Sequence, residues 1–504
     1  MIKNIYLFLC LLFLYGILKA QPGSVNMTPV QSLGLVPVQV EVPAAFKSTM
    51  SGSYTVYLPA GYKATIFYAG GLNKPRFLAF NSAGVLHVSD MFTNNNGKIY
   101  ALPDADGNGV ADSARVAATG FVNNHDVKFY NGQMYVTEEQ KVWKLTDANS
   151  DGIFESRSIF IDSIGWRAAQ PVGGHRTRSI VFDAEQKKVY VSIGSLCNVC
   201  REDYRAVIEQ YDENGKNGRV FASGVRNAVG MAVHPQTGRL WANNNGSDRQ
   251  GDFIPPEWID IIRDQGFYGY PFAYANQVWF NFDAHSDYAA LKPIVAADSV
   301  KVIKMIEPAA LIQAHTAPMA LTFLNNTFPI AMRNGMLSAL RGSWNTPQNY
   351  KGYKLVYLDL SSATDTTVNY VADFCTGFIT DTINRVYWGR PVGLAIAPNG
   401  DIYMSSDESN RFIMRIYRDG PTGLSPNLEM PKQLMVYPNP ASTQLFINCA
   451  QAPSLIEVFN AQGKVVFQSK GSIKNVDVEN WPRGVYFVHA TINQTIVTNK
   501  VVLW

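Results

Sequence analysis

The chain has 504 residues, more than one typical domain, so at least two folding units with a substantial core are expected. Charged residues make up only 16% of the sequence, which is typical of exported proteins, and the net charge of +3 comes with no polybasic run. This composition argues against nucleic acid or an anionic membrane as the main partner.

The first twenty residues, MIKNIYLFLCLLFLYGILKA, are predicted to be a signal peptide. A lysine near the start precedes an apolar run that is too short to span a membrane comfortably, and Ala20 ends the run. Cys10 lies inside this segment and is expected to leave with it. The four remaining cysteines indicate an oxidising compartment with few disulfides, and residues 21–57 follow as an N-terminal extension.

One pattern recurs along residues 58–417: a short polar or proline-bearing lead, an apolar strand, a turn and a second strand. Six copies begin at Lys74, Asn124, Thr177, Asn227, Ala317 and Arg390. The first four begin about 50 residues apart, which is the size of one β-propeller blade. The predicted fold class is therefore all-β with a six-bladed propeller, and a sandwich with similar hairpins is the alternative.

The spacing between the fourth and fifth copies is almost doubled, which predicts an insertion over residues 252–315. We expect this insertion to form a lid or wall over one mouth of the central channel.

The residues directly before the inner strands of a propeller point toward its central channel, so chemistry is expected there. These leading residues are Arg76, Asn124 with His125, His175 with Arg176, Arg226 with Asn227, Thr316, and Arg390. Arginines and amides from separate blades thus converge on one opening, which predicts an anion site around a histidine.

Two acidic loops, DADGNGVAD and DANSDGIFE, have the pattern of calcium-binding loops. The oxygen-bearing side chains are Asp104, Asp106, Asn108 and Asp112 in the first loop, and Asp147, Asn149, Asp151 and Glu155 in the second. Oxygen ligands at alternate positions, with a glycine for the tight turn, suit Ca²⁺. A structural Ca²⁺ is predicted in each loop; the alternative is that acidic, Gly-rich turns merely join strands.

The stretch PVGGHRTRSIVF, residues 171–182, sets His175 between a Gly-Gly turn and two arginines. A neutral imidazole beside cationic groups has a lowered pKa, so it remains available as a base near neutral pH. No nucleophile elbow, Walker loop or Rossmann fingerprint offers a competing catalytic device. His175 is therefore the candidate general base.

Cys197 and Cys200 form the motif CNVC, which is found in metal half-sites, redox motifs and local disulfides. No second cysteine pair or suitably spaced histidine completes a zinc site, and a thioredoxin-like role requires a βαβ setting. The motif favours a local disulfide that stabilises a loop at the channel mouth.

After Tyr417 the repeat stops, and residues 418–433 have the composition of a linker. Residues 434–504 alternate apolar and polar side chains around turns, which predicts a small β-sandwich. YPNP, GVYF and Lys500 make this segment similar to the C-terminal sorting domain of type IX secretion cargo. The resemblance implies the secretion machinery as a partner, passage through the periplasm, and a protein that is secreted or attached to the cell surface.

Segments of the propeller resemble the soluble sugar dehydrogenases that depend on pyrroloquinoline quinone (PQQ), especially their sorbosone and pyranose branch. They are GLNKP, GGHRTRSI, GSLCNVCRED, GVRNAVGMAVHP, NNGSDRQGD, GFYGYP, HTAPMALTF, LRGSWN and GRPVGLAIAPNGD. The resemblance implies a secreted oxidoreductase that uses PQQ and Ca²⁺ to oxidise an aldose or related sugar. An external electron acceptor is expected because the sequence has no CxxCH haem motif.

The resemblance also assigns roles to single residues. His175 is implied to be the general base that removes the proton from a sugar hydroxyl as hydride passes to the quinone. Arg226 is implied to stabilise the negative charge that develops on the quinone oxygen. The implied cofactor contacts are Asn124, Asn227, Thr316, and the carboxylate-binding Arg341 and Arg390. A catalytic Ca²⁺ is implied at the backbone carbonyls of Gly246 and Ser247.

Two positions depart from the pattern of this family. Gly174 stands where the glucose-oxidising branch has an acid before the base, and Val392 replaces a second cofactor-binding arginine. Two alternatives therefore stay open: a non-catalytic carbohydrate-binding or adhesive propeller, and a calcium-dependent lactonase-like propeller. The arginines before the strands argue against the lactonase, which holds its metal with carboxylates and amides.

Overall fold

The computed structural model describes residues 23–164, 173–347, 349–418, 434–449, 452–492 and 495–503. The signal peptide predicted at residues 1–20 and nearly all of the predicted linker lie outside these ranges. The described residues contain two α-helices, α1 (Ser286–Ala289) and α2 (Ala296–Ile303), and 3-10 turns at Ala44–Phe46 and Ile330–Met332. None of these helices is long and apolar enough to cross a membrane.

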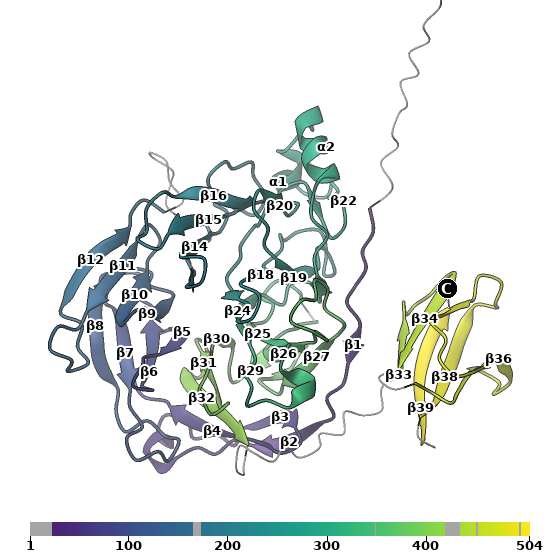
Figure 1. Cartoon of the computed structure of the whole chain (residues 1–504), viewed down its shortest axis with the longest axis horizontal. Helices are drawn as coiled ribbons and strands as arrows, with labels where there is room; N and C mark the ends of the chain where they lie inside the picture. The colour runs from purple at the N-terminus through teal and green to yellow at the C-terminus, as the bar shows by residue number, and fades with distance from the viewer. Residues whose placement is uncertain are drawn as a thin grey trace, which may run out of the picture.

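Six antiparallel sheets of four strands each are arranged around a central axis (Figure 1). Blade one contains β5 (Pro75–Phe80), β6 (Leu86–Asp90), β7 (Gly97–Leu102) and β8 (Arg115–Phe121). Blade two contains β9 (Val127–Tyr130), β10 (Gln133–Thr137), β11 (Val142–Thr146) and β12 (Ser156–Ile161). Blade three contains β13 (Ile180–Asp183), β14 (Lys188–Ile193), β15 (Val207–Asp212) and β16 (Arg219–Ser223).

The other three blades complete the ring. Blade four contains β17 (Met231–Val233), β18 (Leu240–Asn244), β19 (Glu257–Ile261) and β23 (Ala310–Ile312). Blade five contains β24 (Pro318–Phe323), β25 (Met336–Leu340), β26 (Lys354–Leu358) and β27 (Val371–Cys375). Blade six contains β30 (Pro391–Ile396), β31 (Ile402–Ser406), β32 (Phe412–Arg418) and β4 (Tyr62–Tyr68). The predicted six-bladed propeller is therefore confirmed.

Five further short strand pairings lie outside the four main strands of each blade. The parallel strands β1 (Val30–Gln31) and β20 (Gly266–Phe267) extend blades five and three. The hairpins are β2 (Leu35–Gln39) with β3 (Thr55–Pro59), β21 (Ala273–Tyr274) with β22 (Val278–Trp279), and β28 (Ile379–Asp381) with β29 (Val386–Tyr387).

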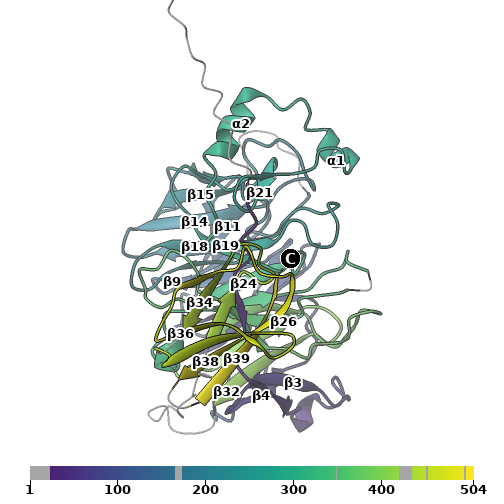
Figure 2. The ribbon, with the colours of Figure 1, turned by 90° about the vertical axis from the view of Figure 1, so that its right-hand side faces the viewer.

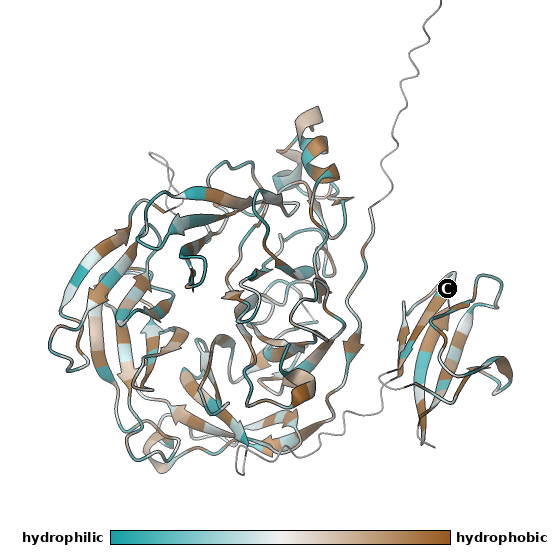
Figure 3. Cartoon of the chain, viewed as in Figure 1, coloured by the Kyte–Doolittle hydropathy of each residue, from teal (hydrophilic) through white to brown (hydrophobic). Residues whose placement is uncertain are grey.

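Apolar residues recur in the strands of the ring and are interspersed with polar ones (Figure 3). Every residue of β25 and of β31 is buried. One hydrophobic cluster joins β7 and β8 to β9 and β10, and another joins β18 and β19 to β25 and β26. Burial of these faces between sheets is the main force that assembles the ring.

A strand from the N-terminal part of the chain closes the ring. β4 is the outermost strand of blade six and pairs antiparallel with β32, so that Ala64 lies opposite Ile416. The two ends of the propeller therefore share one sheet, which leaves no open edge between blade six and blade one.

Buried side chains fix the inner strands of neighbouring blades relative to one another. Thr137 Oγ1 donates to the carbonyl oxygen of Arg178 at 2.7 Å, and Asn243 Nδ2 donates to that of Met319 at 2.6 Å. Ser405 makes the same kind of bond across the closure, because its hydroxyl donates to the carbonyl oxygen of Arg76 at 2.5 Å. These bonds determine where the leading residues of each blade lie.

The predicted insertion at residues 252–315 is too long, because it includes two strands of blade four. β19 and β23 pair with each other, and all residues of both strands are buried. The inserted segment therefore lies between Ile261 and Ala310, and it contains both α-helices. Figures 1 and 2 place α1 and α2 at the edge of the ring opposite β3 and β4.

The C-terminal residues form the predicted small β-sandwich. One sheet contains β33 (Leu434–Tyr437), β34 (Gln444–Cys449) and β37 (Asn475–Asp477). The other contains β36 (Val465–Lys470), β35 (Leu455–Asn460), β38 (Gly484–Ile492) and β39 (Thr495–Leu503). Leu445, Val458 and Val488 are fully buried in a core of this domain alone.

Contact between blades six and one leaves no room for a side chain at Gly393. A Cβ atom there would collide with the carbonyl oxygen of Arg76 and lie 2.8 Å from Ser405 Oγ. We expect Gly393→Ala to lower the free energy of unfolding by about 1–3 kcal/mol, because backbone atoms must move. Urea unfolding of the purified protein measures this change.

Gly61→Ala is the comparison variant. Gly61 has a φ of +86° but open space around its missing Cβ, so this change is expected to cost about 1–2 kcal/mol from backbone strain only. A Gly393→Ala protein as stable as the wild type would show that the closure is less tightly packed than described.

Candidate functional site

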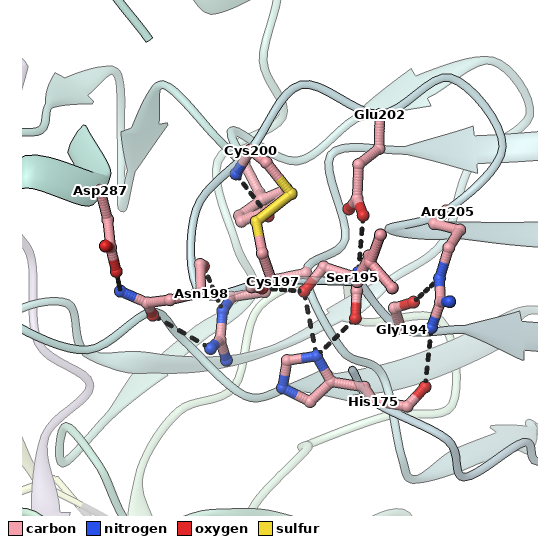
Figure 4. Close-up of a disulfide and its surroundings, with 12 residues drawn as sticks. His175, Gly194, Ser195, Cys197, Asn198, Cys200, Glu202, Arg205 and Asp287 are labelled. Atoms are coloured by element: carbon pink, nitrogen blue, oxygen red, sulfur yellow. Dashed lines mark hydrogen bonds between the residues drawn. A yellow bond between two sulfur atoms is a disulfide. The ribbon is translucent and has the colours of Figure 1, made fainter. Parts of the chain in front are cut away.

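His175 lies on the loop that leads into β13, and Ser195 fixes its ring (Figure 4). His175 Nδ1 lies 2.8 Å from the carbonyl oxygen of Ser195 and 3.0 Å from its hydroxyl oxygen. A carbonyl oxygen only accepts hydrogen bonds, so Nδ1 carries the proton in the neutral ring. Nε2 is therefore the basic atom of His175.

The surroundings keep this imidazole neutral. Burial and, next in size, the positive charge of Arg226 lower the pKa of His175 to about 3. The hydrogen bond to Ser195 acts in the opposite direction, while Arg205 and Arg178 add to the lowering. A ring that stays unprotonated at neutral pH is suited to accept a proton.

The backbone explains why glycine rather than an acid precedes His175. Gly174 has a φ of +58°, and a Cβ atom there would collide with the backbone of Leu196. Two carboxylates hold this region from other positions: Glu139 Oε1 accepts from Gly173 N, and Glu202 Oε1 accepts from Leu196 N, both at 2.6 Å. These acids fix the loops around the base without touching its ring.

Arg226 is buried and bound on all sides by acceptors. Its Nε donates to the carbonyl oxygen of Asn198 at 2.9 Å, and its Nη1 donates to the carbonyl oxygens of Gly246 and Asn245 at 2.6 and 3.2 Å. Its Nη2 donates to Asn198 Oδ1 at 3.2 Å and lies 3.8 Å from the Asp248 carboxylate. The guanidinium position is therefore set by the loops that follow β14 and β18.

The local disulfide expected from CNVC is confirmed, because Cys197 and Cys200 are bonded. Their bond closes a short loop beside His175 (Figure 4). Ser195 Oγ donates to the carbonyl oxygen of Cys197 at 2.8 Å, and Cys200 N donates to the hydroxyl of Tyr270 at 3.0 Å. The free cysteines among the described residues are Cys375 and Cys449.

Three arginines from separate blades share two carboxylates. Asp407 forms ion pairs with Arg76 and, at 2.9 Å, with Arg341 Nε. Glu408 Oε2 accepts from Arg341 Nη2 at 2.8 Å and from Arg390 Nη1 at 2.7 Å. Three guanidinium groups thus face two carboxylates, so the cluster keeps a net positive charge and favours an anion.

The ionisation of Glu408 is secured by its partners. Burial acts to raise its pKa, but a hydrogen bond from Tyr387 and the charges of Arg390 and Arg341 lower the pKa to about 2. Some donors remain unused, because Arg341 Nη1 and Arg76 Nη2 have no hydrogen-bond partner among the described residues. These groups are available to an anionic ligand.

Two residues expected to line the channel are buried instead. Asn124 is fully buried, and its Nδ2 donates to Ser89 Oγ at 2.8 Å and to the carbonyl oxygens of Asp90 and Lys98. Thr316 is also fully buried, and its hydroxyl donates to the carbonyl oxygen of Gln313 at 3.0 Å. The Asn124 amide nitrogen and the Thr316 hydroxyl thus bind atoms of the propeller itself, while Asn124 Oδ1 keeps an unused acceptor, and cofactor contact of both residues stays a prediction.

Asn227 keeps an unused polar group, whereas Val392 belongs to the apolar core. The side chain of Asn227 is mostly buried, yet its Oδ1 has no hydrogen-bond partner, so it keeps an unused acceptor. Val392 lies fully buried in β30 among apolar residues, and an arginine there would require repacking of this core. Core packing therefore explains the valine at position 392.

The carbonyl groups at Gly246 and Ser247 lie in a well-fixed turn. Gly246 N donates to the buried carboxylate of Glu257 at 2.5 Å, and the carbonyl oxygen of Gly246 accepts from Arg226. Ser247 Oγ lies at hydrogen-bond distance, 2.8 Å, from the hydroxyl oxygen of Tyr288. A cation at this turn would sit next to the Arg226 guanidinium.

The two acidic loops differ in how well they suit a cation. Both lie on outer hairpins, between the third and fourth strands of blades one and two. Side-chain oxygens of Asp147, Asp151 and Glu155 gather within 4.8 Å of one another, and Asn149 binds Asp151. Among the described residues, the carboxylates of Asp104, Asp106 and Asp112 form no such group.

Two contacts distinguish the first loop, because both loops otherwise share an Asn-to-Asp bond and carboxylate-to-backbone bonds. Asp112 Oδ2 accepts from Ala105 N at 2.7 Å. The guanidinium of Arg415 lies against Gly109. The carboxylates of residues 104–112 therefore do not gather in this structure, and a positive charge lies beside them.

The acids that hold the site were missed, although the sequence carries a signal for them. Asp90 ends the second strand of a repeat copy, and Glu139, Asp248 and Asp407 each follow one. In the structure these carboxylates bind leading loops or arginines, as in the pairs of Asp90 with Lys74 N and Asp407 with Arg341. An acid at or after the end of the second strand is thus a recurring anchor of this propeller.

Comparison with known proteins covers almost the entire described chain. Residues 56–417 match the TrAA12-like family, and residues 435–503 match the secretion system C-terminal sorting domain. The sorting domain indicates export, either to the cell surface or beyond it. An uncharacterized protein from Borreliella burgdorferi is 27% identical over 377 residues, which covers 72% of this chain and 91% of that protein.

Solved structures share the propeller fold. The family AA12 enzyme of Trichoderma reesei is 20% identical with a TM-score of 0.60, over 72% of this chain and 97% of its own. The PQQ domain of pyranose dehydrogenase from Coprinopsis cinerea, in its holo form, is 21% identical with a TM-score of 0.59, over 75% and 98%. A calcium structure of the Trichoderma enzyme is 20% identical with a TM-score of 0.59, over 72% and 96%.

The lowered pKa of His175 is directly measurable. We expect its imidazole to stay neutral at about pH 5, because burial and Arg226 oppose protonation. Histidine NMR signals followed through a pH titration, with His175→Gln to assign the resonance, would test this. Titration of His175 near its ordinary pKa of 6.5 would contradict the described surroundings.

The same shift predicts how stability depends on pH. The folded pKa of His175 lies below the unfolded value, so the unfolded chain binds more protons between pH 6.5 and about 3. Stability should therefore fall as the pH falls through this window, and it should fall less steeply in His175→Gln.

Proposed function

The chain belongs to the TrAA12-like family, and we propose that it is an exported PQQ- and Ca²⁺-dependent dehydrogenase that oxidises an aldose or related sugar. The observation that carries the proposal is a neutral His175, with Nε2 unprotonated, beside the fixed guanidinium of Arg226. The relatives with solved structures are sugar oxidoreductases, which supports the same reaction class.

The residues around the axis fit an anionic quinone. PQQ carries carboxylates, and Arg341 Nη1 and Arg76 Nη2 offer unused donors for them beside Arg390. Asn227 Oδ1 is a buried acceptor without a partner, as expected beside a polar ligand. We propose Arg76, Asn227, Arg341 and Arg390 as the cofactor-binding residues.

The proposed reaction begins at the base. His175 Nε2 takes the proton from the sugar hydroxyl, while the carbon-bound hydrogen leaves with its electron pair. PQQ, when bound, supplies the acceptor for that electron pair. Ser195 keeps the proton on Nδ1, so that Nε2 faces the substrate in its accepting form.

Arg226 contributes positive charge where negative charge develops. Its acceptors Asn198, Asn245 and Gly246 hold the guanidinium before the substrate arrives, so little reorganisation is required. The same charge disfavours the protonated form of His175, which helps the base to release its proton to solvent.

We propose that Ca²⁺ binds at the backbone carbonyls of Gly246 and Ser247, where it would share the Gly246 oxygen with Arg226, and a second, structural ion at Asp147, Asp151 and Glu155. The calcium structure of the Trichoderma enzyme supports calcium as the metal. The gathered carboxylates of the second loop support the structural ion. Electrons then pass to an external acceptor, and the sorting domain engages the type IX machinery after passage through the periplasm.

Reconstitution with PQQ and Ca²⁺ tests the reaction. We expect the mature protein to reduce an artificial dye when given aldoses, and His175→Ala to lower kcat by about 10²- to 10⁴-fold because the general base is lost. Dye reduction across a panel of aldoses is the measurement. His489→Ala, a substitution in the C-terminal sandwich, should leave kcat unchanged.

Failure to bind PQQ at high cofactor concentration would overturn the dehydrogenase. A carbohydrate-binding or adhesive propeller would then be the better account. Binding of PQQ without any sugar oxidation would place the error in the substrate class.

The arginine cluster predicts cofactor affinity. We expect Arg341→Ala to weaken PQQ binding at least about tenfold, because loss of a hydrogen bond to a charged group costs about 1.5–3 kcal/mol. Absorbance titration with PQQ measures the Kd. Arg219→Ala removes an exposed ion pair between Arg219 of blade three and Asp264, and this variant should bind PQQ like the wild type. An unchanged Kd for Arg341→Ala would exclude Arg341 from the site.

A further inference from the structure

The loop closed by the Cys197–Cys200 disulfide lies beside His175 (Figure 4). It contacts Arg226 directly through Asn198, and it is linked to His175 through Ser195. The inserted segment packs on the opposite side of the same loop.

Asn198 is the central residue of these contacts. Its carbonyl oxygen accepts from Arg226 Nε at 2.9 Å, and its Oδ1 accepts from Arg226 Nη2 at 3.2 Å. The same Oδ1 accepts from Asp248 N at 2.8 Å, and Nδ2 donates to the Asp248 carbonyl oxygen at 3.2 Å. Asn198 therefore binds Arg226 with two acceptors and ties it to the loop after β18.

The amide of Asn198 is also oriented from the insertion. Asn198 Nδ2 donates to Asp287 Oδ2 of α1 at 3.0 Å, which determines which end of the side-chain amide faces Arg226. The hydroxyl of the neighbouring Tyr288 donates to the Asp248 carbonyl oxygen at 2.8 Å and lies 2.8 Å from Ser247 Oγ, which can donate to it. Contacts with the insertion thus fix the side-chain amide of Asn198.

The disulfide supplies the restraint that hydrogen bonds alone lack. Asn198 lies between the two bonded cysteines, in a loop of buried and partly buried residues without regular secondary structure. The carbonyl oxygen of Cys197 receives the hydroxyl of Ser195, which in turn contacts His175 Nδ1. Tyr270 accepts from Cys200 N at the other end of the loop. Closing so short a loop removes most of its alternative backbone conformations.

We propose that Asn198 is a positioning residue for Arg226 and that the Cys197–Cys200 disulfide holds Asn198 in place. The inference rests on the proposed function for its effect on turnover. It adds that the disulfide is a component of the catalytic geometry, so the enzyme reaches full activity only after oxidation of these cysteines in an oxidising compartment.

Steady-state kinetics of the reconstituted protein provide the first test. Asn198→Ala should lower kcat at least about tenfold, while KM and the Kd for PQQ change less than about threefold, because Arg226 acts on charge in the transition state. Cys197→Ser/Cys200→Ser should lower kcat at least as much, because it releases the Asn198 carbonyl as well as the side chain. The triple variant should be no worse than the disulfide variant, since both changes act through one position.

Hydrogen–deuterium exchange of the protein without cofactor provides a second test that needs no activity. The amide of Asp248 is bound to Asn198 Oδ1, so its exchange should accelerate in Asn198→Ala and in the cysteine variant. Peptides from the outer strands should exchange as in the wild type. This readout separates the two proposals, because it decides the role of the disulfide even if no sugar is oxidised.

Two control variants separate positioning from general loosening. Arg201→Ala removes the ion pair with Asp298, at 2.8 Å, that ties the same loop to α2, but it leaves every Arg226 contact in place. Cys449→Ser replaces a free cysteine of the C-terminal sandwich. Both should keep wild-type kcat. An equal loss of kcat in Arg201→Ala, additive losses in the triple variant, or unchanged Asp248 exchange in the cysteine variant would overturn the proposal.

Discussion

Positive charge buried near the propeller axis is the constraint on which the rest of the site depends. Buried guanidinium groups are costly unless carboxylates pair with them. Asp407 of blade six pairs with Arg76 of blade one and Arg341 of blade five, so the compensation exists only in the closed ring. Pairing of β4 with β32 therefore maintains both the fold and the anion site.

Burial also constrains the charges of His175 and Arg226, although other groups respond to it there. His175 is neutral because it is buried among cations, and Arg226 is held by carbonyl oxygens and a carboxamide. Both residues depend on loops that follow the second strands of their blades. Ser195 and Asn198, on either side of Cys197, connect the base to the guanidinium through one disulfide-closed loop.

The inserted segment and the C-terminal sandwich relate differently to this site. Asp287 and Tyr288 of α1 reach the loops that carry Asn198 and Asp248, so the insertion is part of the support of the site. The sandwich has a hydrophobic core of its own, as expected for a sorting domain that acts on export independently of catalysis. The candidate site and the sorting domain thus belong to separate folding units.

The sequence by itself determined the six blades, because strand alternation and turn residues are local signals that repeat with each copy. It also determined the CNVC disulfide, whose partners are separated by three positions, and the candidates His175, Arg226, Arg341 and Arg390. The tertiary structure decided which leading side chains are buried, as for Asn124 and Thr316, because their orientation depends on contacts between blades. It alone paired Arg76 with Asp407, which lie 331 positions apart, since only closure of the ring brings those residues together.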